Sequence, residues 1–330
     1  MAKASKYNQY IKIGNPVEPK EGFDPVMIEM AQKDPRILMV LEDMGGPGIK
    51  WFAQNMPERV IECGVAEANA AVVCGALAAE GFIPVVHSFD FALLARAYNQ
   101  IRQSILVDRF NVKLLGRGGA WGDTGISHNY VETFALMRCL PNLVILSVAD
   151  VVEAKKAFAA MLKYVGPVFI RQEAGPVPPT IYTEDYPFQI GKAYSIKDGN
   201  DATIIATGLM VGIAIEAEKL LEKEGYNVGI LDMSTLKPLD EAAIIKASVE
   251  TGAIVTAENG SIIGGLGEGV AAVLCENAPC PMVRFGVEDE FSQSGRDSDI
   301  RGKLANHFAL TPEDLAVSVK EAIAKKKKKK

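Results

Sequence analysis

The first half of the chain alternates short apolar runs with longer amphipathic or small-residue runs. The apolar runs predict buried strands at 36–42, 111–117, 142–148 and 167–172. The stretches between them predict helices at 65–79, 92–106, 129–139 and 152–164. Strands that alternate with helices of about 10–15 residues indicate βαβ units and a parallel sheet.

A proline-rich segment interrupts this alternation, which then resumes. The segment GPVPPTIYTEDYP (175–187) holds four prolines and no helical period, as is typical of a linker. Beyond it the pattern predicts a helix at 211–224 and strands at 202–208, 227–233, 253–258 and 281–287. We therefore predict an α/β fold of two consecutive three-layer αβα domains with mostly parallel sheets. Their expected bounds are 15–178 and 190–324, joined by a linker at 179–189.

Composition and charge narrow the class of protein. The chain is 48% hydrophobic and only 7% aromatic, as parallel α/β cores are. Its net charge is −6, and because Lys325–Lys330 are all lysine the remainder carries −12. An acidic body argues against a nucleic-acid partner. We expect the lysine run at 325–330 to be a solvated, disordered end.

The five cysteines are scattered without a C-x-x-C pair, which is typical of buried, reduced thiols. No apolar run reaches transmembrane length, and the N-terminal residues contain no apolar leader segment. The expectation is a cytoplasmic protein with no membrane partner.

One acid, Glu67, opens a predicted helix that is otherwise small and apolar. The helix dipole favours a carboxylate at this position, so a capping role is one interpretation. However, a helix that is apolar all round packs between other layers, which would place Glu67 near a buried edge. There a carboxylate is best used in a fixed, charge-assisted hydrogen bond.

Three further stretches could bind a ligand. HSFDFALLARAYNQIR (87–102) follows a strand end, and its Phe89 and Phe91 could stack on a flat heterocycle or pack in the core. GRGGAWGDTGISHN (116–129) is a loop with five glycines whose exit carries His128, a candidate for proton handling. It is neither a Walker A motif nor a dinucleotide fingerprint. ENGSIIGGLGEGVAAVL (258–274) reads as a tight structural turn or a weak anion site.

Taken in order, these motifs resemble the transketolase family. GVAEAN, RAYNQIR, GDTGISHN, LPNLVILSVAD and FIR are similar to its pyrimidine-binding domain. DGNDATIIATG, LDMSTLKPLD, SIIGGLGEGV and EFSQSG are similar to its C-terminal domain. The resemblance covers roughly residues 20–324 and rests on the whole ordered set of motifs.

The resemblance implies that thiamine diphosphate is the cofactor and that Glu67 is its catalytic acid. In the family this acid hydrogen-bonds the aminopyrimidine and favours the tautomer that deprotonates the thiazolium carbon. The other expected cofactor contacts are Asp43, Phe89 and Phe91. His128 is expected to be catalytic and to contact the substrate, and the other expected substrate contacts are His87, Arg117, Thr124 and Arg171.

The family's diphosphate and Mg²⁺ motif, G-D-G followed by Asn, does not occur in this sequence. The resemblance therefore implies one subunit of a split transketolase, with no metal ligand of its own. A separate subunit would hold Mg²⁺ and the diphosphate, with α2β2 as the natural assembly.

Several positions depart from the family pattern. Thr124 stands where an acid contacts a sugar hydroxyl, Gly116 where a histidine helps hold phosphate, and Pro47 where a serine does so. Because these changes fall on the sugar-phosphate side, we expect transfer of a two-carbon ketol unit from a non-standard anionic sugar. A sulfonated ketose, or a branched or shortened sugar phosphate, would fit.

Three other interpretations stay open. DFALLARAYNQI also suits the β-subunit of a 2-oxo-acid dehydrogenase, which would need a lipoyl carrier as acceptor. An enzyme like deoxyxylulose-phosphate synthase would decarboxylate pyruvate. A non-catalytic protein that kept the fold would show no turnover that depends on Glu67.

Overall fold

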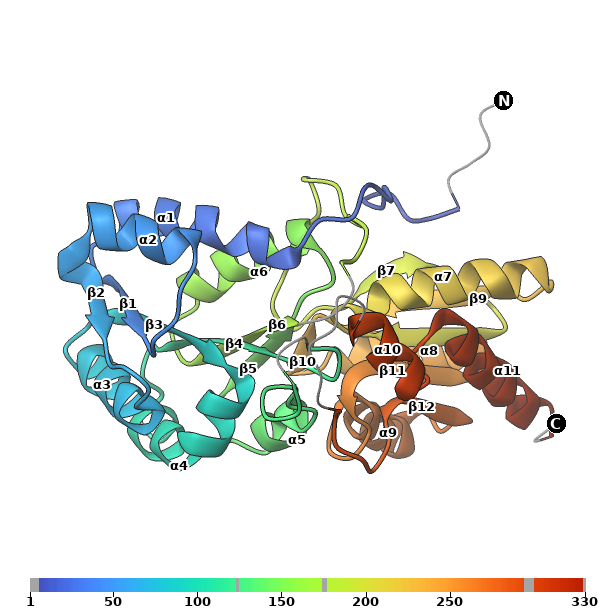
Figure 1. The fold of residues 1–330 in the computed structure, drawn as a ribbon. Helices are drawn as coiled ribbons and strands as arrows, with labels where there is room; N and C mark the ends of the chain where they lie inside the picture. Colours follow the sequence, from blue (N-terminus) through green and yellow to red (C-terminus); the bar gives the residue numbers. More distant parts are fainter. Residues whose placement is uncertain (1–5, 123–124, 174–176, 294–299, 329–330) are drawn as a thin grey trace.

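The computed structural model describes residues 6–122, 125–173, 177–293 and 300–328 and confirms the predicted α/β class. Two sheets lie side by side, each covered by helices (Figure 1). The strands of the first sheet, in spatial order, are β10 (Thr235–Lys237), β5 (Val144–Ser147), β6 (Val168–Glu173), β4 (Lys113–Gly118), β3 (Ile83–Phe89), β1 (Ile37–Leu41) and β2 (Val60–Glu62). All of these pair in parallel except β10, which pairs antiparallel with β5.

Helices cover both faces of the first sheet. One face carries α1 (Phe23–Lys33), α2 (Pro47–Asn55) and α6 (Val151–Lys163), and the other carries α3 (Glu67–Ala79), α4 (Tyr98–Ile101) and α5 (Thr133–Arg138). Two short 3₁₀ turns, η1 (Pro19–Gly22) and η2 (Pro57–Arg59), precede α1 and β2. Because both faces are covered, β1 and β6 are buried at every position, and β1 reads in the sequence as an unbroken apolar run.

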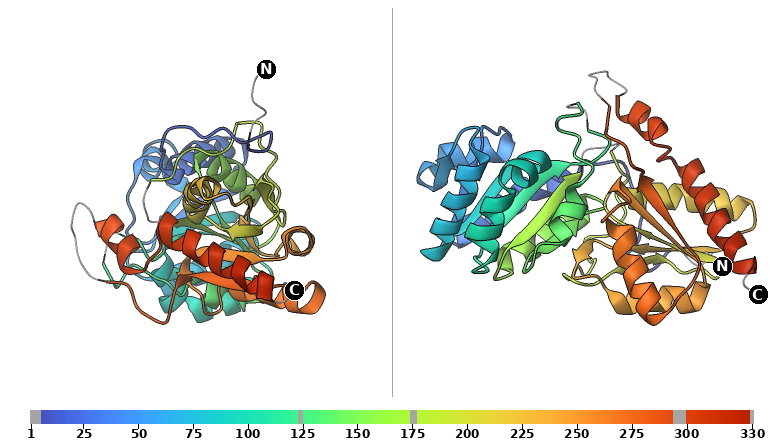
Figure 2. Two further views of the ribbon diagram at one scale, coloured as in Figure 1. Left: turned by 90° about the vertical axis from the view of Figure 1, so that its right-hand side faces the viewer. Right: turned by 90° about the horizontal axis from the view of Figure 1, so that it is seen from below.

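The second sheet has the order β12 (Met282–Val287), β11 (Ile254–Ser261), β8 (Ala202–Ala206), β9 (Val228–Asp232) and β7 (Tyr194–Lys197). Only β7 is antiparallel to its neighbour. Its helices are α7 (Met210–Lys223), α8 (Glu241–Thr251), α9 (Leu266–Asn277), α10 (Ile300–His307) and α11 (Pro312–Lys328). α7 packs with α11 and α8 packs with α9, which places one pair on each face (Figure 2).

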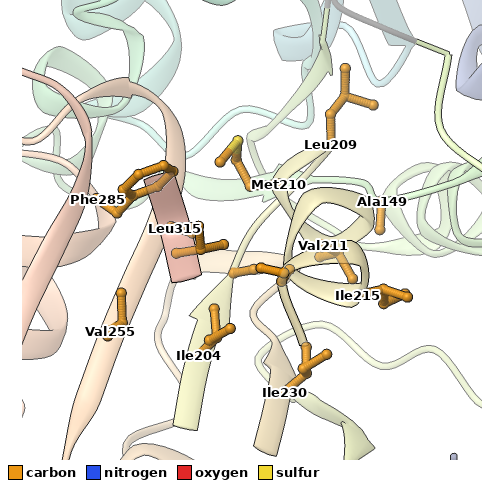
Figure 3. Close-up of a cluster of buried hydrophobic side chains, with 14 of the residues drawn as sticks. Ala149, Ile204, Leu209, Met210, Val211, Ile215, Ile230, Val255, Phe285 and Leu315 are labelled. Atoms are coloured by element: carbon orange, nitrogen blue, oxygen red, sulfur yellow. The ribbon is translucent and has the colours of Figure 1, made fainter. Parts of the chain in front are cut away.

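Two segments tie the halves together. β10 lies in the second half of the sequence but extends the first sheet. The N-terminal segment crosses to the second half, where Asn8 N donates to Ile196 O at 3.0 Å and Ile11 bridges Tyr182. A buried apolar cluster spans the join: Figure 3 shows Ala149, which follows β5, next to Val211 and Ile215 of α7, in a cluster that also includes side chains of β8, β9, β11, β12 and α11.

Most predicted strands and helices are present, with four differences. The predicted helix at 92–106 is α4 flanked by two π-helical turns, η3 (Ala92–Arg96) and η4 (Arg102–Leu106). The helix predicted from 129 begins only at Thr133, because Gly125–Tyr130 form hydrogen-bonded turns. The third difference is a set of elements that were not predicted: the short strands β7 and β10 and the helices α1, α2, α8, α10 and α11.

The fourth difference is a correction at the C-terminus. Lys325–Lys328 continue α11 instead of forming a disordered end. Lys326 Nζ donates to Thr251 O at 2.6 Å, which satisfies a carbonyl at the end of α8 and anchors the last turns of α11.

Candidate functional site

The candidate site residues collect where parallel strands of the first sheet end. β1, β2, β3 and β4 are neighbours in register, with Leu41 opposite both Glu62 and His87, and His87 opposite Leu115. Parallel neighbours present their carboxyl ends at one edge, which is where open α/β sheets bind ligands.

Glu67 is the first residue of α3, and its side chain is 8% exposed. Its Oε1 accepts a hydrogen bond from Arg96 Nη1 at 2.7 Å. Arg96 ends the π-helical turn η3, and its own side chain is 52% exposed. Of the two interpretations of Glu67, the structure therefore favours the fixed, charge-assisted hydrogen bond at a buried edge.

An aromatic cluster adjoins this ion pair. The Arg96 guanidinium lies 5.1 Å from the centroid of Phe91, within cation–π range. Phe91 and Phe89 are stacked with centroids 5.9 Å apart, and the His128 ring meets both edge-on at 4.6 and 4.8 Å. All three rings are only partly buried, so Phe89 and Phe91 retain surface beyond their packing role.

His128 is brought to this cluster by the glycine-rich loop. The loop turns back on itself through hydrogen bonds from His128 N and Asn129 N to Gly125 O, at 2.9 and 3.0 Å. His128 Nδ1 lies 2.9 Å from Ser127 Oγ, which fixes the ring orientation. The structure thus brings together four of the predicted residues: Glu67, Phe89, Phe91 and His128.

Glu42 is a residue that sequence reasoning missed. It directly follows β1 and is 6% exposed, and among the described residues no donor meets hydrogen-bond distance and geometry at its carboxylate oxygens, so the neighbouring Ser88 interacts with it only weakly. Burial raises the pKa of Glu42 to about 7; the nearby charges of Glu67 and Glu62 add to this, and Ser88 partly opposes it. An acid inside the run LEDM was the only signal in the sequence.

Asp43, expected to contact the cofactor, is exposed at the same edge. Its φ of +57° is unusual for a residue other than glycine. The backbone N–H groups of Asp43 and Gly64 both donate to Glu62 Oε1, at 3.0 and 2.7 Å. The Glu62 side chain therefore links the turn after β1 to the turn after β2, which leads into Glu67.

A cavity of about 270 Å³ lies at the same strand ends. Its lining includes Lys20, His87, Arg117 and Gln172, together with the backbone turn at Gly45–Pro47. Burial and the charge of Arg117 lower the pKa of His87 to about 4, with Gln172 opposing, so His87 is a neutral group. Lys20 and Arg117 supply two cations to the cavity and Glu21 and Asp24 supply two carboxylates, so its lining is charged but formally balanced.

Arg171 does not reach this cavity. It is fully buried, its Nη2 pairs with Glu173 Oε1 at 2.6 Å, and its guanidinium lies 3.9 Å from the centroid of Phe134. Arg171 Nε and Nη1 have no hydrogen-bond partner among the described residues, and the expectation that Arg171 binds a substrate anion stays a prediction. Thr124 lies outside the described residues.

Within the described ranges, metal-binding clusters and membrane-spanning helices are not found. Nowhere in those ranges do three or more His, Cys, Asp or Glu side chains gather so that they could hold a metal ion. None of the helices in the same ranges combines the length and apolarity that a membrane span requires.

Comparisons with known proteins match the whole arrangement. Residues 16–178 match the model described as "Transketolase, pyrimidine binding domain", and 191–315 match "Transketolase, C-terminal domain". A 6-deoxy-6-sulfo-D-fructose transketolase subunit, SqwH, of Clostridium sp. (strain MSTE9) is 36% identical over 93% of this chain and 95% of its own. An apulose-4-phosphate transketolase subunit of Phocaeicola vulgatus is 33% identical over 94% of this chain and 99% of its own.

Longer relatives and a solved structure agree. The chain spans 46% of a 1-deoxy-D-xylulose-5-phosphate synthase of Heliobacterium modesticaldum, with 36% identity. The solved structure titled "Split gene transketolase, inactive beta4 tetramer" is 34% identical and matches with a TM-score of 0.84, covering 95% of this chain and 99% of that one.

Proposed function

Because this chain belongs to the transketolase family of transferases and spans its pyrimidine-binding and C-terminal domains, we propose that it is one subunit of a two-subunit transketolase. In this proposal the enzyme moves a two-carbon ketol unit from an anionic ketose to an aldose. The observation that carries the proposal is the convergence of Glu67, Arg96, Phe89, Phe91 and His128 at one sheet edge.

The described residues fit the aminopyrimidine end of thiamine diphosphate. Glu67 offers a nearly buried carboxylate for a ring nitrogen, and Arg96 orients that carboxylate. The partly buried rings of Phe89 and Phe91 offer apolar faces to a flat heterocycle. When bound, the cofactor supplies the carbanion chemistry, while the protein supplies orientation and electrostatics.

His128 is the proposed proton-handling and donor-contacting group of this chain. Its Nδ1 is engaged by Ser127, and its ring packs against Phe89 and Phe91 in T-shaped contacts. A histidine fixed in this way can hold or move a proton at the substrate hydroxyl group next to it.

The proposal includes a separate subunit that holds Mg²⁺ and the diphosphate. α3 is apolar on all sides, yet Val72 is 45% exposed and Val65, just before the helix, is 66% exposed. Such an apolar helix normally lies between other layers. The exposed face begins beside Glu67, so a subunit that covered it would also close the site. Two relatives are named as transketolase subunits, which supports this interpretation.

The proposed donor is a non-standard anionic sugar. The cavity lies at the carboxyl ends of the strands of the first sheet, the edge at which Glu67 also lies. Its lining includes Lys20 and Arg117, which suit a sulfonate or phosphate group. Gly116 and Pro47 offer no side-chain donor to that group, unlike the histidine and serine of the family pattern. The two relatives named for sulfofructose and apulose 4-phosphate support a donor of this class.

The first experiment is calorimetric titration of thiamine diphosphate with Mg²⁺ into this chain alone and into its mixture with a candidate diphosphate-binding subunit. We expect binding only in the mixture. Tight binding by this chain alone would contradict the proposed division of the site between two subunits. If thiamine diphosphate does not bind to the mixture with any candidate subunit, the proposal that it is the cofactor is contradicted.

Substrate screening of the loaded mixture tests the donor. We expect ketol transfer from a sulfonated ketose, or from a branched or shortened sugar phosphate, to an aldose. Efficient transfer between xylulose 5-phosphate and ribose 5-phosphate at ordinary KM values would refute the non-standard donor. Turnover only with a lipoyl carrier, or decarboxylation of pyruvate, would overturn the transketolase assignment itself.

A further inference from the structure

The glycine-rich loop that carries His128 is held by the other half of the chain. We call residues 118–131 the His128 loop; its described arms are 118–122 and 125–131. On the first arm, Ala120 N donates to Asn259 Oδ1 at 2.8 Å. A Cβ on Gly119, whose φ is +116°, would lie 2.6 Å from Asn259 Nδ2. Glycine is therefore required there both by backbone conformation and by close approach.

The second arm is held by the same strand end. Ser261 N donates to Val131 O at 2.8 Å, and a Cβ on Gly260 would lie 3.0 Å from that oxygen. Residues 259–261 are the last three of β11. One strand end of the second sheet thus contacts the loop on both sides of His128.

Ser292 links the two arms to each other. Its hydroxyl donates to Ala120 O at 3.2 Å and accepts from Asn129 Nδ2 at 3.1 Å. Asn129 Nδ2 also donates to Gly122 O at 3.0 Å, which joins the arms directly. Ser292 and Asn129 are 1% and 4% exposed, so water does not compete for these hydrogen bonds.

Asn259 is itself fixed by a buried ion pair. Arg171 Nη2 donates to Asn259 O at 2.8 Å and to Glu173 Oε1 at 2.6 Å, and Asn259 Nδ2 donates to Glu173 Oε2 at 3.3 Å. Glu173 also accepts from Ser147 Oγ at 2.7 Å and from Leu209 N at 3.1 Å. These paired atoms restrain Asn259 from both its backbone and its side chain, although Arg171 Nε and Nη1 have no partner among the described residues.

We propose that Asn259 and Ser292 are positioning residues that set where His128 stands against Phe89 and Phe91. Asn129, the residue after His128, receives the restraint directly, and the His128 ring lies 4.6–4.8 Å from the two phenylalanine rings. The second half of the chain thereby acts on a site that the first half supplies. The link from loop position to turnover rests on the proposed function; the restraint of the loop does not.

Trp121, inside the His128 loop, offers a direct probe of that restraint. Trp51 and Trp121 are the chain's two tryptophans, and Trp121 is 0% exposed. In a Trp51→Phe parent, acrylamide quenching of Trp121 should be weak. Adding Asn259→Ala or Ser292→Ala should shift the quenching constant toward that of the urea-unfolded chain, while far-UV circular dichroism stays that of the parent.

The matched control is Asn277→Ala. Asn277 Nδ2 donates to Val273 O at 2.9 Å at the end of α9, so this variant removes a hydrogen bond of the same half outside the loop. Its quenching constant should equal that of the parent. Trp121 remaining fully shielded in a folded Asn259→Ala or Ser292→Ala variant would overturn the proposal, and Ser292→Ala carries the test if Asn259→Ala does not fold.

Turnover with the second subunit gives an independent readout. Asn259→Ala and Ser292→Ala should lower kcat/KM for the donor roughly tenfold or more, mainly through KM, because loop displacement misplaces His128. The Kd for thiamine diphosphate should stay at the parent value. If a variant makes Trp121 accessible to acrylamide while the KM for the donor stays unchanged, the positioning role is overturned. A parent mixture without ketol transfer would instead overturn the proposed function, since the quenching result needs no turnover.

Discussion

Glu67 shows how one residue combines local and tertiary causes. Its place at the start of α3 follows from the sequence, whereas its partner Arg96 comes from a π-helical turn 29 residues later. The ion pair is only partly shielded, because the Arg96 side chain is half exposed. The carboxylate is thus nearly buried by this chain, whereas the Arg96 side chain that orients it remains half exposed.

At this scale we expect Glu67→Ala to fold normally and to lose at least about two orders of magnitude in turnover with the second subunit. Glu67→Gln should retain little activity, because the amide cannot replace the carboxylate. Steady-state kinetics and circular dichroism check both statements. The exposed Glu80→Gln, at the other end of α3, is the matched control and should turn over like the parent.

Glu42 leads to a prediction about pH. Its folded pKa of about 7 lies above the ordinary 4.5, so the folded chain retains a proton that the unfolded chain loses between these values. The stability contributed by protonated Glu42 is complete below about pH 4.5 and is lost as pH rises toward 7. Relative to the parent, Glu42→Gln should therefore gain about 2 kcal/mol of unfolding free energy from pH 5 to pH 8.

Urea titrations of the isolated chain at the two pH values measure this difference. Glu42→Ala should show the same pH trend from a lower baseline, since it also lacks the titrating group. A stability difference that does not change with pH in either variant would contradict the assignment of a buried, proton-retaining carboxyl.

At the scale of the element, α3 is the informative helix. Its small apolar residues suggested burial on all sides, but the structure buries one face and leaves Val72 exposed. Helix periodicity could not reveal this, because the sequence is nearly uniform around the axis. The exposed face is a property of the isolated chain that a second subunit would change.

We expect Val72→Asp to weaken association with the diphosphate-binding subunit by roughly tenfold or more, because a charge would be buried in an apolar contact. Sedimentation velocity of the mixture measures this. Val249→Asp is the control, because Val249 is also an exposed valine on a helix: it lies on α8 and is 74% exposed. This variant should associate like the parent. Equal association of both variants would show that α3 is not the contact surface.

At the scale of the whole molecule, the two halves are locked together. β10 completes the first sheet, and the linker is pinned because Ile181 N and Tyr182 N both donate to Asp150 Oδ2, at 2.6 and 2.9 Å. Tyr182 Oη in turn donates to Asp232 Oδ2 at 2.6 Å, in the second sheet. The described part of the proline-rich segment, residues 177–187, is therefore a fixed joint between the halves.

This joint predicts a single cooperative urea transition, seen at the same midpoint by tryptophan fluorescence and far-UV circular dichroism. Asp150→Ala should lower the unfolding free energy by about 3 kcal/mol, since it also removes the N-cap of α6, and should move both signals together. Two separate transitions in the parent would contradict the coupling.

The sequence alone determined what depends on local pattern and on motif order. Apolar runs such as 37–41 predicted buried parallel strands, and the ordered motifs from GVAEAN to EFSQSG identified the family and singled out Glu67 as the acid to test. The tertiary structure alone decided the pairings between distant residues. It added β10 to the first sheet, buried Arg171 beside Glu173 and placed Asn259 against the His128 loop. Periodicity reports which face of an element is buried, whereas the choice of partner depends on packing across the whole chain.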